Sequence, residues 1–274
     1  MLFKRILTAG VGIPAAIFII NYGQWLYGLT ISLLAFVAWH EYVRMMKYKQ
    51  IKVSNLLGGI GIGALIGCAW VGNPSETVAV SVLITMAVLT KMVLSYHTFS
   101  LADAAFTFAG FLYIGLSFSH LVMLRFLDSS LGSASGALLP FGALYLWLAF
   151  LGTWASDTFA YFVGSKFGRT KLAPAISPSK TREGATGGLV GCIFTVIVFG
   201  NYFNIPLVHL FFLGLVVGIT APVGDLVQSV IKRYVGIKDS GNFFPGHGGV
   251  LDRFDSIMFA VPAVYYYLQI FLLR

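Results

Sequence analysis

Charged residues are scarce in this sequence, at 10% of 274 residues, and the mean hydropathy is +0.85. Soluble globular domains contain about 25% charged residues, so this composition excludes an ordinary soluble protein. The formal net charge is +8, but no polar basic domain is present to carry nucleic acid. Nucleic acid is therefore not expected as a partner.

Cysteine is also scarce. Cys68 and Cys192 both lie in apolar segments, and neither has a second Cys or His at metal-ligand spacing. This pattern favours small side chains in helix packing over a disulfide or a cysteine-ligated metal. No convincing small-residue cleavage site follows the apolar run near the N-terminus, so an uncleaved membrane anchor is expected.

Long apolar runs recur along the whole chain, and most approach the roughly 20 residues that cross a bilayer as a helix. We expect an all-α polytopic membrane protein with about nine transmembrane helices. The expected division is a lipid-facing scaffold at 1–140 and a catalytic part at 141–274, with cytoplasmic loops at 165–185 and 232–255. The nine spans are expected at 6–21, 24–43, 54–72, 77–95, 103–124, 141–164, 186–202, 207–231 and 256–273.

The distribution of basic residues predicts an orientation. With a cytoplasmic N-terminus, nine spans place all 18 Lys and Arg residues except Lys91, Arg125 and Arg274 on the cytoplasmic side. Cytoplasmic loops are typically enriched in Lys and Arg. The C-terminus and the Ser/Gly-rich segment 126–140 are then expected outside.

Acidic residues are few, and their positions are uneven. Six of the ten lie between residues 157 and 255, in or beside the cytoplasmic ends of the last four expected spans. A charge in hydrocarbon costs about 2.5–3.5 kcal/mol on insertion scales, so such a concentration indicates a functional site. The six are Asp157, Glu183, Asp225, Asp239, Asp252 and Asp255.

Glu41 stands apart from this group, at the end of the second expected span and beside a basic loop. We expect an interfacial ion pair with Arg44 or Lys47. A place in the lining of a polar cavity is the alternative.

The eighth expected span carries an acid followed by basic residues. On a helix, Asp225, Ser229, Lys232 and Arg233 share one face. Pro222 lies just before them and allows a kink that would free a backbone carbonyl. A buried Asp neutralised by a basic neighbour is the structural alternative.

The sequence PGHGGVLDRFDS follows at 245–256. Its glycines allow close approach of the backbone to a ligand and can point N–H groups at an anion. Carboxylates from two helices, Asp225 from one and Asp252 or Asp255 from the other, suit an oxygen-liganded Mg²⁺. His247 is expected either to contact a phosphate or to support the turn. A solvated charged loop is the alternative for the whole run.

A third polar stretch, SPSKTREGATGG, lies at 177–188 after a basic hairpin. Lys180 and Arg182 supply positive charge, and the glycines open the seventh span, whose N-terminal N–H groups favour an anion. Asp157 is an acid inside the sixth span with Tyr161 one turn later, and a hydrogen-bonded structural role is its alternative. Together the three stretches offer metal ligands and phosphate clamps at the depth of lipid headgroups, as phosphoryl or nucleotidyl transfer onto a lipid requires.

These residues resemble the phosphatidate cytidylyltransferases, or CDP-diacylglycerol synthases. The pattern S-x-x-K-R-x4-K-D-x5-P-G-H-G-G-x-x-D-R-x-D of that family is matched from Ser229 to Asp255. Asp157-Thr158 with Ala160-Tyr161 and Gly164 resembles D-T-x-A-Y-x-x-G, and residues 177–184 resemble S-P-x-K-T-x-E-G. Trp39 to Tyr42 resembles W-E-[FY], with His40 inserted. Two departures are Gln228, where many members have Glu, and Arg182, where many have an aromatic residue.

The resemblance implies a nucleotidyltransferase of phospholipid synthesis that makes CDP-diacylglycerol and pyrophosphate from CTP and phosphatidic acid. It implies Mg²⁺ at Asp225 and Asp252, leaving open a second, monovalent cation. The catalytic residues implied are Asp225, Asp252, Asp255, Lys232 and Arg233. The substrate-binding residues implied are Asp157, Lys180, Thr181, Glu183, Ser229, Lys238, Asp239, His247, Gly248, Gly249 and Arg253.

Other expectations concern the setting of the enzyme. We expect a multi-pass protein of the bacterial inner membrane whose active site faces the cytoplasm, with a homodimer left open. The nearest rival is another CTP-dependent lipid kinase of the polyprenol or phytol type, which would not carry the full PGHGG-x-x-DRFD run. A proton- or cation-coupled transporter is disfavoured, because its acids would lie near mid-bilayer in both halves.

Overall fold

The computed structural model describes residues 2–72, 74–127 and 139–273. The described part is mostly helical, and a long helix lies at each of the nine expected positions. Most of the segment expected outside, at 128–138, is not among the described residues. The helices are α1 (Leu2–Tyr22), α2 (Gln24–Lys47), α3 (Asn55–Val71), α4 (Pro74–Leu94), α5 (Leu101–Arg125), α6 (Phe141–Phe167), α7 (Arg182–Tyr202), α8 (Leu207–Val235), the short α9 (Leu251–Phe254) and α10 (Ile257–Phe271).

Five of the described helices are long and apolar enough to cross a membrane: α2, α4 from Ser75, α5, α7 and α8. Shorter apolar helices lie at Gly10–Tyr22, Asn55–Val71 and Ile257–Phe271. The chain is therefore a multi-pass membrane protein. Nine spans and the orientation of the termini stay predictions.

Short β-structure accompanies the helices. Strands β1 (Lys171–Ala173) and β2 (Ser177–Thr181) pair antiparallel, with Lys171 opposite Thr181. This hairpin lies within the expected cytoplasmic loop 165–185, so the all-α expectation is correct for the spans but incomplete for the loop.

The chain divides into two compact units. The first contains Met1–Phe126 and Tyr234–Arg253, and the second contains Leu127–Arg233 and Phe254–Arg274. The expected boundary near residue 140 differs from this division, because residues 234–253 group with the N-terminal helices. The functional division into scaffold and catalytic part stays a prediction.

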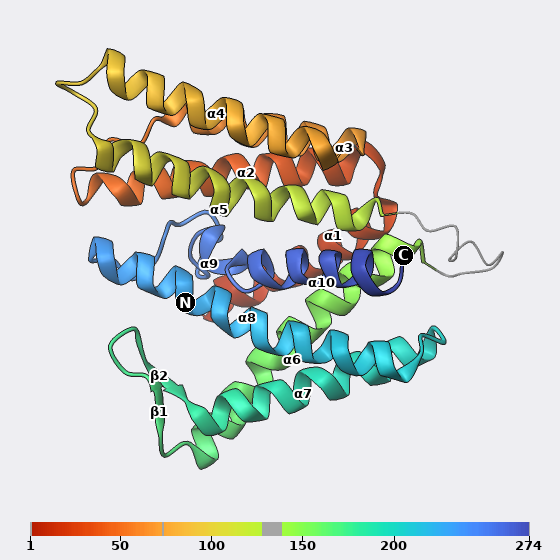
Figure 1. Cartoon of the computed structure of the whole chain (residues 1–274). Helices are drawn as coiled ribbons and strands as arrows, with labels where there is room; N and C mark the ends of the chain where they lie inside the picture. Colours follow the sequence, from red (N-terminus) through yellow and green to blue (C-terminus); the bar gives the residue numbers. More distant parts are fainter. Residues whose placement is uncertain (1, 73, 128–138, 274) are drawn as a thin grey trace. The chain divides into compact units, whose positions relative to one another are not determined.

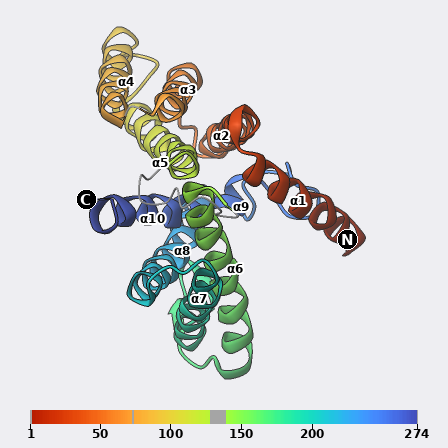
Figure 2. The ribbon, with the colours of Figure 1, turned by 90° about the vertical axis from the view of Figure 1, so that its right-hand side faces the viewer.

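In the first unit, α2, α3, α4 and α5 lie side by side (Figure 1), and Figure 2 shows them nearly end-on. Aromatic side chains of α2 hold its neighbours. Trp39 Nε1 donates a hydrogen bond to the Asn55 carbonyl at the start of α3 (3.0 Å), and Tyr42 Oη donates to the Phe106 carbonyl of α5 (2.9 Å). The Phe106 ring stacks on Tyr234, which begins the second segment of this unit, with centroids 5.6 Å apart. The end of α2 is therefore fixed against α3 and α5, and α5 in turn contacts the segment that begins at Tyr234.

In the second unit, α6 and α7 pack closely, with contacts that run from Gly152 against Val196 to Gly164 against Gly184. Small residues permit this approach. A Cβ on Gly188 would lie 2.7 Å from the Ser156 carbonyl oxygen, and one on Gly184 would lie 2.8 Å from that of Ala160. Helix packing in membranes commonly depends on small residues spaced in this way. The glycines expected to favour an anion thus lie in the contact between the two helices.

Candidate active site

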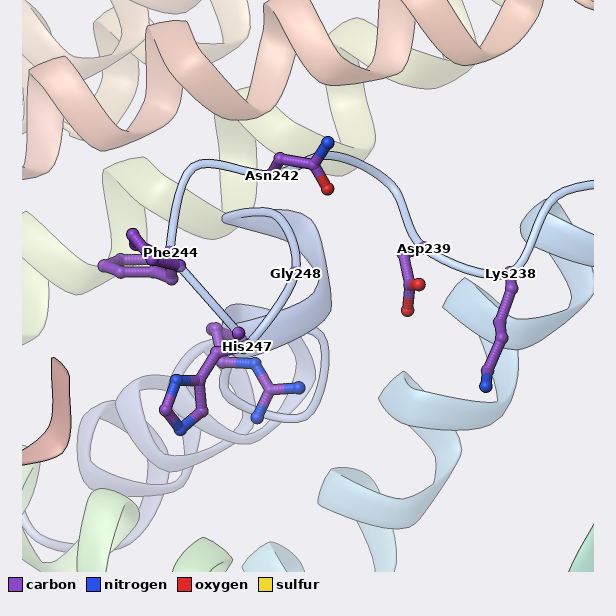
Figure 3. Close-up of a pocket in the computed structure, with 9 residues that line it drawn as sticks. Lys238, Asp239, Asn242, Phe244, His247 and Gly248 are labelled. Atoms are coloured by element: carbon purple, nitrogen blue, oxygen red, sulfur yellow. The ribbon is translucent and has the colours of Figure 1, made fainter. Parts of the chain in front are cut away.

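The first unit contains a cavity of about 550 Å³ formed by the loop that precedes α9. Figure 3 shows this loop doubling back after Phe244, with the side chains of Lys238, Asp239 and His247 extending to the same side of it. The complete lining is Lys238, Asp239, Asn242, Phe244, Pro245, Gly246, His247, Gly248 and Arg253. Five of the residues expected to bind substrate (Lys238, Asp239, His247, Gly248 and Arg253) therefore line one cavity.

The loop has its shape because of glycine. Gly246 has φ +78° and Gly248 has φ +94°, in the left-handed region that other residues rarely adopt. The turn closes by hydrogen bonds from His247 N to the Phe244 carbonyl and from Phe244 N to the Gly248 carbonyl, both 2.9 Å. His247 Nδ1 is buried and has no hydrogen-bond partner among the described residues. A buried ring nitrogen without a partner is costly, so this atom suits a ligand group or an ordered water.

Asp252 holds the base of the loop. Its Oδ2 accepts hydrogen bonds from Ser240 N (2.7 Å), Ser240 Oγ (2.9 Å) and Gly249 N (3.0 Å). One oxygen of this predicted metal ligand therefore receives three donors from its own unit. Gly249, expected to bind substrate, contributes a backbone donor to Asp252.

The second unit contains a separate cavity of about 470 Å³, lined by α6, the β2 strand, the start of α7 and the middle of α8. Lys180 Nζ lies 2.6 Å from Asp225 Oδ2 in an ion pair. Asp157 and Thr181 line the same cavity. Four of the expected site residues, from three segments that are far apart in the sequence, are thus brought together here.

Asp225 is surrounded by other polar groups of its unit. Ser229 Oγ donates a hydrogen bond to Asp225 Oδ1 at 3.3 Å, one helical turn along α8. The pKa of Asp255 is raised to about 7. The larger cause is the loss of hydration at this half-buried position, and the second is the negative charge of Asp225. Lys232 and the Ser256 N–H lower this pKa, and Asp157 raises it. Asp157, Asp225 and Asp255 therefore share one acidic environment.

Arg233 and two other predicted residues have contacts around the hairpin. Arg233 Nε donates to the Ile176 carbonyl between the two strands (3.3 Å). Glu183 accepts hydrogen bonds from the backbone N–H groups of Arg169 and Thr170, at 3.1 Å each. The Thr181 hydroxyl caps α7 by accepting from Gly184 N (3.1 Å). These contacts order the loop. The catalytic role of Arg233 and the substrate-binding roles of Glu183 and Thr181 stay predictions.

Three residues outside the expected site have notable surroundings. Glu41 is buried and accepts hydrogen bonds from Val250 N (2.9 Å) and Leu251 N (3.0 Å), with neither Arg44 nor Lys47 as an ion-pair partner in the described chain. The expected ion pair is therefore wrong. Ser240, which contacts Asp252, had no distinguishing signal in the sequence. Gln228 is fully buried, and neither polar atom of its amide has a hydrogen-bond partner among the described residues.

The donor set fits a hard cation such as Mg²⁺ in its chemistry, because carboxylate oxygens are the ligands that this ion prefers. The negative charges of Asp225 and Asp157 both raise the pKa of Asp255, and a bound cation would oppose this effect. Lys180 already supplies one positive charge, to Asp225. Among the described residues, no three His, Cys, Asp or Glu side chains are grouped closely enough to hold a metal by themselves. A bound Mg²⁺ would therefore take part of its coordination from substrate phosphates or water, as Mg²⁺ commonly does.

The helices define a multi-pass membrane protein, and acidic and basic side chains line its two cavities. The sequence pattern of the Cytidylyltransferase family matches residues 3–271, and the chain belongs to this family. A phosphatidate cytidylyltransferase of Bacillus subtilis (strain 168) is 31% identical over 274 residues, covering 98% of each chain. Proteins of the same name from Staphylococcus saprophyticus and Staphylococcus aureus (strain COL) are 35% and 34% identical, each over 94% of this chain and 95% of its relative. The family expected from the motifs is confirmed.

Proposed function

We propose that this protein transfers the cytidylyl group of CTP to phosphatidic acid, forming CDP-diacylglycerol and pyrophosphate. The observation that carries the proposal is similarity over nearly the whole chain to relatives named phosphatidate cytidylyltransferase. A phosphatidate oxygen attacks the α-phosphorus of CTP, the bond from that phosphorus to the bridging oxygen breaks, and pyrophosphate leaves. The substrate phosphate is the nucleophile, so no covalent enzyme intermediate is needed.

The basic residues have separate parts in this reaction. Lys180 is placed on β2 at a cavity, and its ammonium already faces a carboxylate, so it is suited to hold an anionic substrate near Asp225. Lys238 and Arg253 line the other cavity and provide positive charge for further phosphate oxygens. Lys232 and Arg233 are proposed to neutralise the charge that develops on departing pyrophosphate.

We propose that Asp225 and Asp252 bind Mg²⁺, with Asp255 contributing to the same negative field. The pairing rests on the sequence pattern and on the acidic surroundings of Asp225. A bound Mg²⁺ would supply charge neutralisation on phosphate oxygens. The basic side chains Lys180, Lys238 and Arg253 would orient the phosphate groups of the substrates.

The proposed membrane topology places the N-terminus, the β1–β2 hairpin and residues 232–253 in the cytoplasm of a bacterial inner-membrane protein. It can be tested across α7 with single cysteines at Ser179 and Asn201, which are both exposed. The background carries Cys68→Ala and Cys192→Ala. An impermeant maleimide added to intact cells should label Asn201→Cys only, and inverted membranes should label Ser179→Cys only. Labelling of both from one side contradicts the topology.

The activity can be tested with purified protein in detergent micelles. With CTP radiolabelled in the α-phosphate, Mg²⁺ and phosphatidic acid, the label should enter a lipid product that co-migrates with CDP-diacylglycerol, with one pyrophosphate released for each. With CTP labelled in the γ-phosphate, no label should enter lipid. Transfer of the γ-label to a prenol would instead establish the kinase alternative.

A further inference from the structure

The buried carboxylate of Glu41 lies at the end of α2, where a membrane protein rarely places an acid without a purpose. Its Oε1 accepts a hydrogen bond from Val250 N (2.9 Å), and its Oε2 accepts from Leu251 N (3.0 Å) and Ser240 Oγ (3.1 Å). All three donors belong to the segment that forms the polar cavity of the first unit. Glu41 therefore joins α2 to both ends of this loop.

The contact continues to a predicted metal ligand. The Ser240 hydroxyl that lies against Glu41 also lies 2.9 Å from Asp252 Oδ2, and Ser240 N donates to the same Asp252 oxygen. A hydroxyl has one proton, so Ser240 Oγ donates either to one of the two carboxylates at a time or to both in a single bifurcated hydrogen bond. Movement of Glu41 would therefore displace Ser240 and change the support of Asp252.

Two glycines make room for the Glu41 carboxylate. A Cβ on Gly249 would lie 2.5 Å from each oxygen of that carboxylate, and a Cβ on Gly241 would lie 2.5 Å from Oε1. Contacts this short do not occur at real Cβ atoms. The second glycine of the Gly248-Gly249 pair is thus required by Ser240 Oγ, which is the nearest atom, and by Glu41, a residue more than 200 positions earlier in the sequence.

The helix that carries Glu41 is itself well fixed. Trp39 and Tyr42, on either side of it in the sequence, donate hydrogen bonds to α3 and α5. Both rings are almost fully buried. The carboxylate therefore projects from a rigid element, which is the condition for a group that sets the geometry of a site.

We propose that Glu41 is a positioning residue of the enzyme. It holds residues 240–251 in the conformation that presents His247, Asp252 and Arg253 to the substrates and the metal ion. The inference rests on the proposed function for its catalytic consequence, but the ordering of the loop is independent of that function. Mutation of a residue that hydrogen-bonds to a metal ligand typically lowers metal affinity or activity by about 10–100-fold.

The experiment compares Glu41→Gln, Glu41→Ala and Ser240→Ala with wild type, and uses Glu76→Gln, at an exposed acid of α4, as a matched control. Hydrogen–deuterium exchange of the substrate-free protein in detergent reports the order of peptides covering 240–253. A glutamine at position 41 can keep the acceptor for Leu251 N but places an amide N–H₂ against Val250 N. Exchange should therefore rise in the order wild type, Glu41→Gln, Glu41→Ala, with the other peptides unchanged.

The kinetic expectation differs from that of a general loss of stability. Glu41→Gln should lower kcat and raise the Mg²⁺ concentration for half-maximal activity by about tenfold, with the melting temperature and the KM for phosphatidic acid unchanged. Ser240→Ala should show a smaller change of the same kind, and Glu76→Gln should show none. If Glu41→Ala does not fold, the other two variants carry the test.

Two results would overturn the inference. One is unchanged exchange of 240–253 in the Glu41 variants, and the other is a uniform rise in exchange with wild-type kcat and Mg²⁺ dependence. If wild-type protein makes no CDP-diacylglycerol while exchange in 240–253 still follows the expected order, the proposed function fails and the positioning role of Glu41 in the loop is retained.

Discussion

Glu41 and Asp252 of the first unit are held in a different way from Asp225 and Asp255 of the second. In the first unit, Glu41 and Asp252 accept hydrogen bonds from backbone N–H groups and from the Ser240 hydroxyl. In the second unit, Asp225 faces the Lys180 ammonium, and Asp255 lies in the negative field of Asp225. The first arrangement orders a loop, because its donors are fixed parts of the main chain.

The second arrangement is suited to exchange of partners. A lysine ammonium on a flexible stem can leave one anion for another, whereas a backbone N–H cannot move without its loop. Burial, and then the negative charge of Asp225, raise the pKa of Asp255 in this unit. We infer that the first unit supplies preformed geometry and that the second unit supplies the charge that substrates and Mg²⁺ balance.

The largest effect is expected from the two predicted metal ligands. Asp225→Asn and Asp252→Asn should each reduce kcat beyond the roughly 10–100-fold typical of outer-shell partners, while membrane insertion is kept. The double variant should be little worse than either single variant, because residues that act as a unit are not additive. Single-turnover rates with saturating CTP and phosphatidic acid provide the measurement. Multiplying effects would show that the two acids serve separate steps.

The basic residues give the next test of the comparison. Lys180→Ala should act chiefly by raising the KM for CTP, because this side chain is placed to capture an anion before reaction. Lys232→Ala and Arg233→Ala should act chiefly on kcat, since only interactions that strengthen in the transition state accelerate the chemistry. Steady-state kinetics for both substrates distinguish these patterns. A loss of kcat in Lys180→Ala, with only KM altered in Lys232→Ala and Arg233→Ala, would show that the two roles are assigned the wrong way round.

A smaller effect is expected at the hairpin. Glu183→Gln weakens the acceptor for Arg169 N and Thr170 N, so residues 165–181 should become more accessible to protease. Activity should fall less than in Lys180→Ala, because the hairpin order is disturbed while the ammonium is retained. Limited trypsin digestion in micelles measures the change. Wild-type digestion rates together with lost activity would instead indicate direct substrate contact by Glu183.

The smallest effects concern helix packing. Gly188→Ala places a Cβ 2.7 Å from the Ser156 carbonyl oxygen and should destabilise the second unit by about 1–3 kcal/mol, as overpacking commonly does. Gly67→Ala is the control, because no atom lies within 4 Å of the added Cβ, and it should be neutral or stabilising by about 0.5–1 kcal/mol. Thermal unfolding in detergent reports both. Equal melting temperatures would remove the argument for close α6–α7 packing.

Much of the local structure could be predicted from the sequence. Apolar runs located the long helices, and the glycines of PGHGG indicated a tight loop, which Gly246 and Gly248 form with positive φ. The polar stretches also identified residues that line cavities, including Lys180, Asp225 and His247. Helix α7 begins at Arg182, earlier than expected, because Thr181 caps it and the strand β2 leads directly into it.

The sequence by itself determined the helices and the chemical inventory, since apolar length, glycine and charge act through local backbone and solvation preferences. Only the tertiary structure decided which groups meet. Glu41 accepts hydrogen bonds from residues 199, 209 and 210 positions away, and the nearby Arg44 and Lys47 that the sequence suggested are not its partners. Such contacts depend on how α2 packs against its neighbours through Trp39 and Tyr42. A buried carboxylate must be hydrogen-bonded, and the packing of α2 decides which donors lie close enough to bond to it.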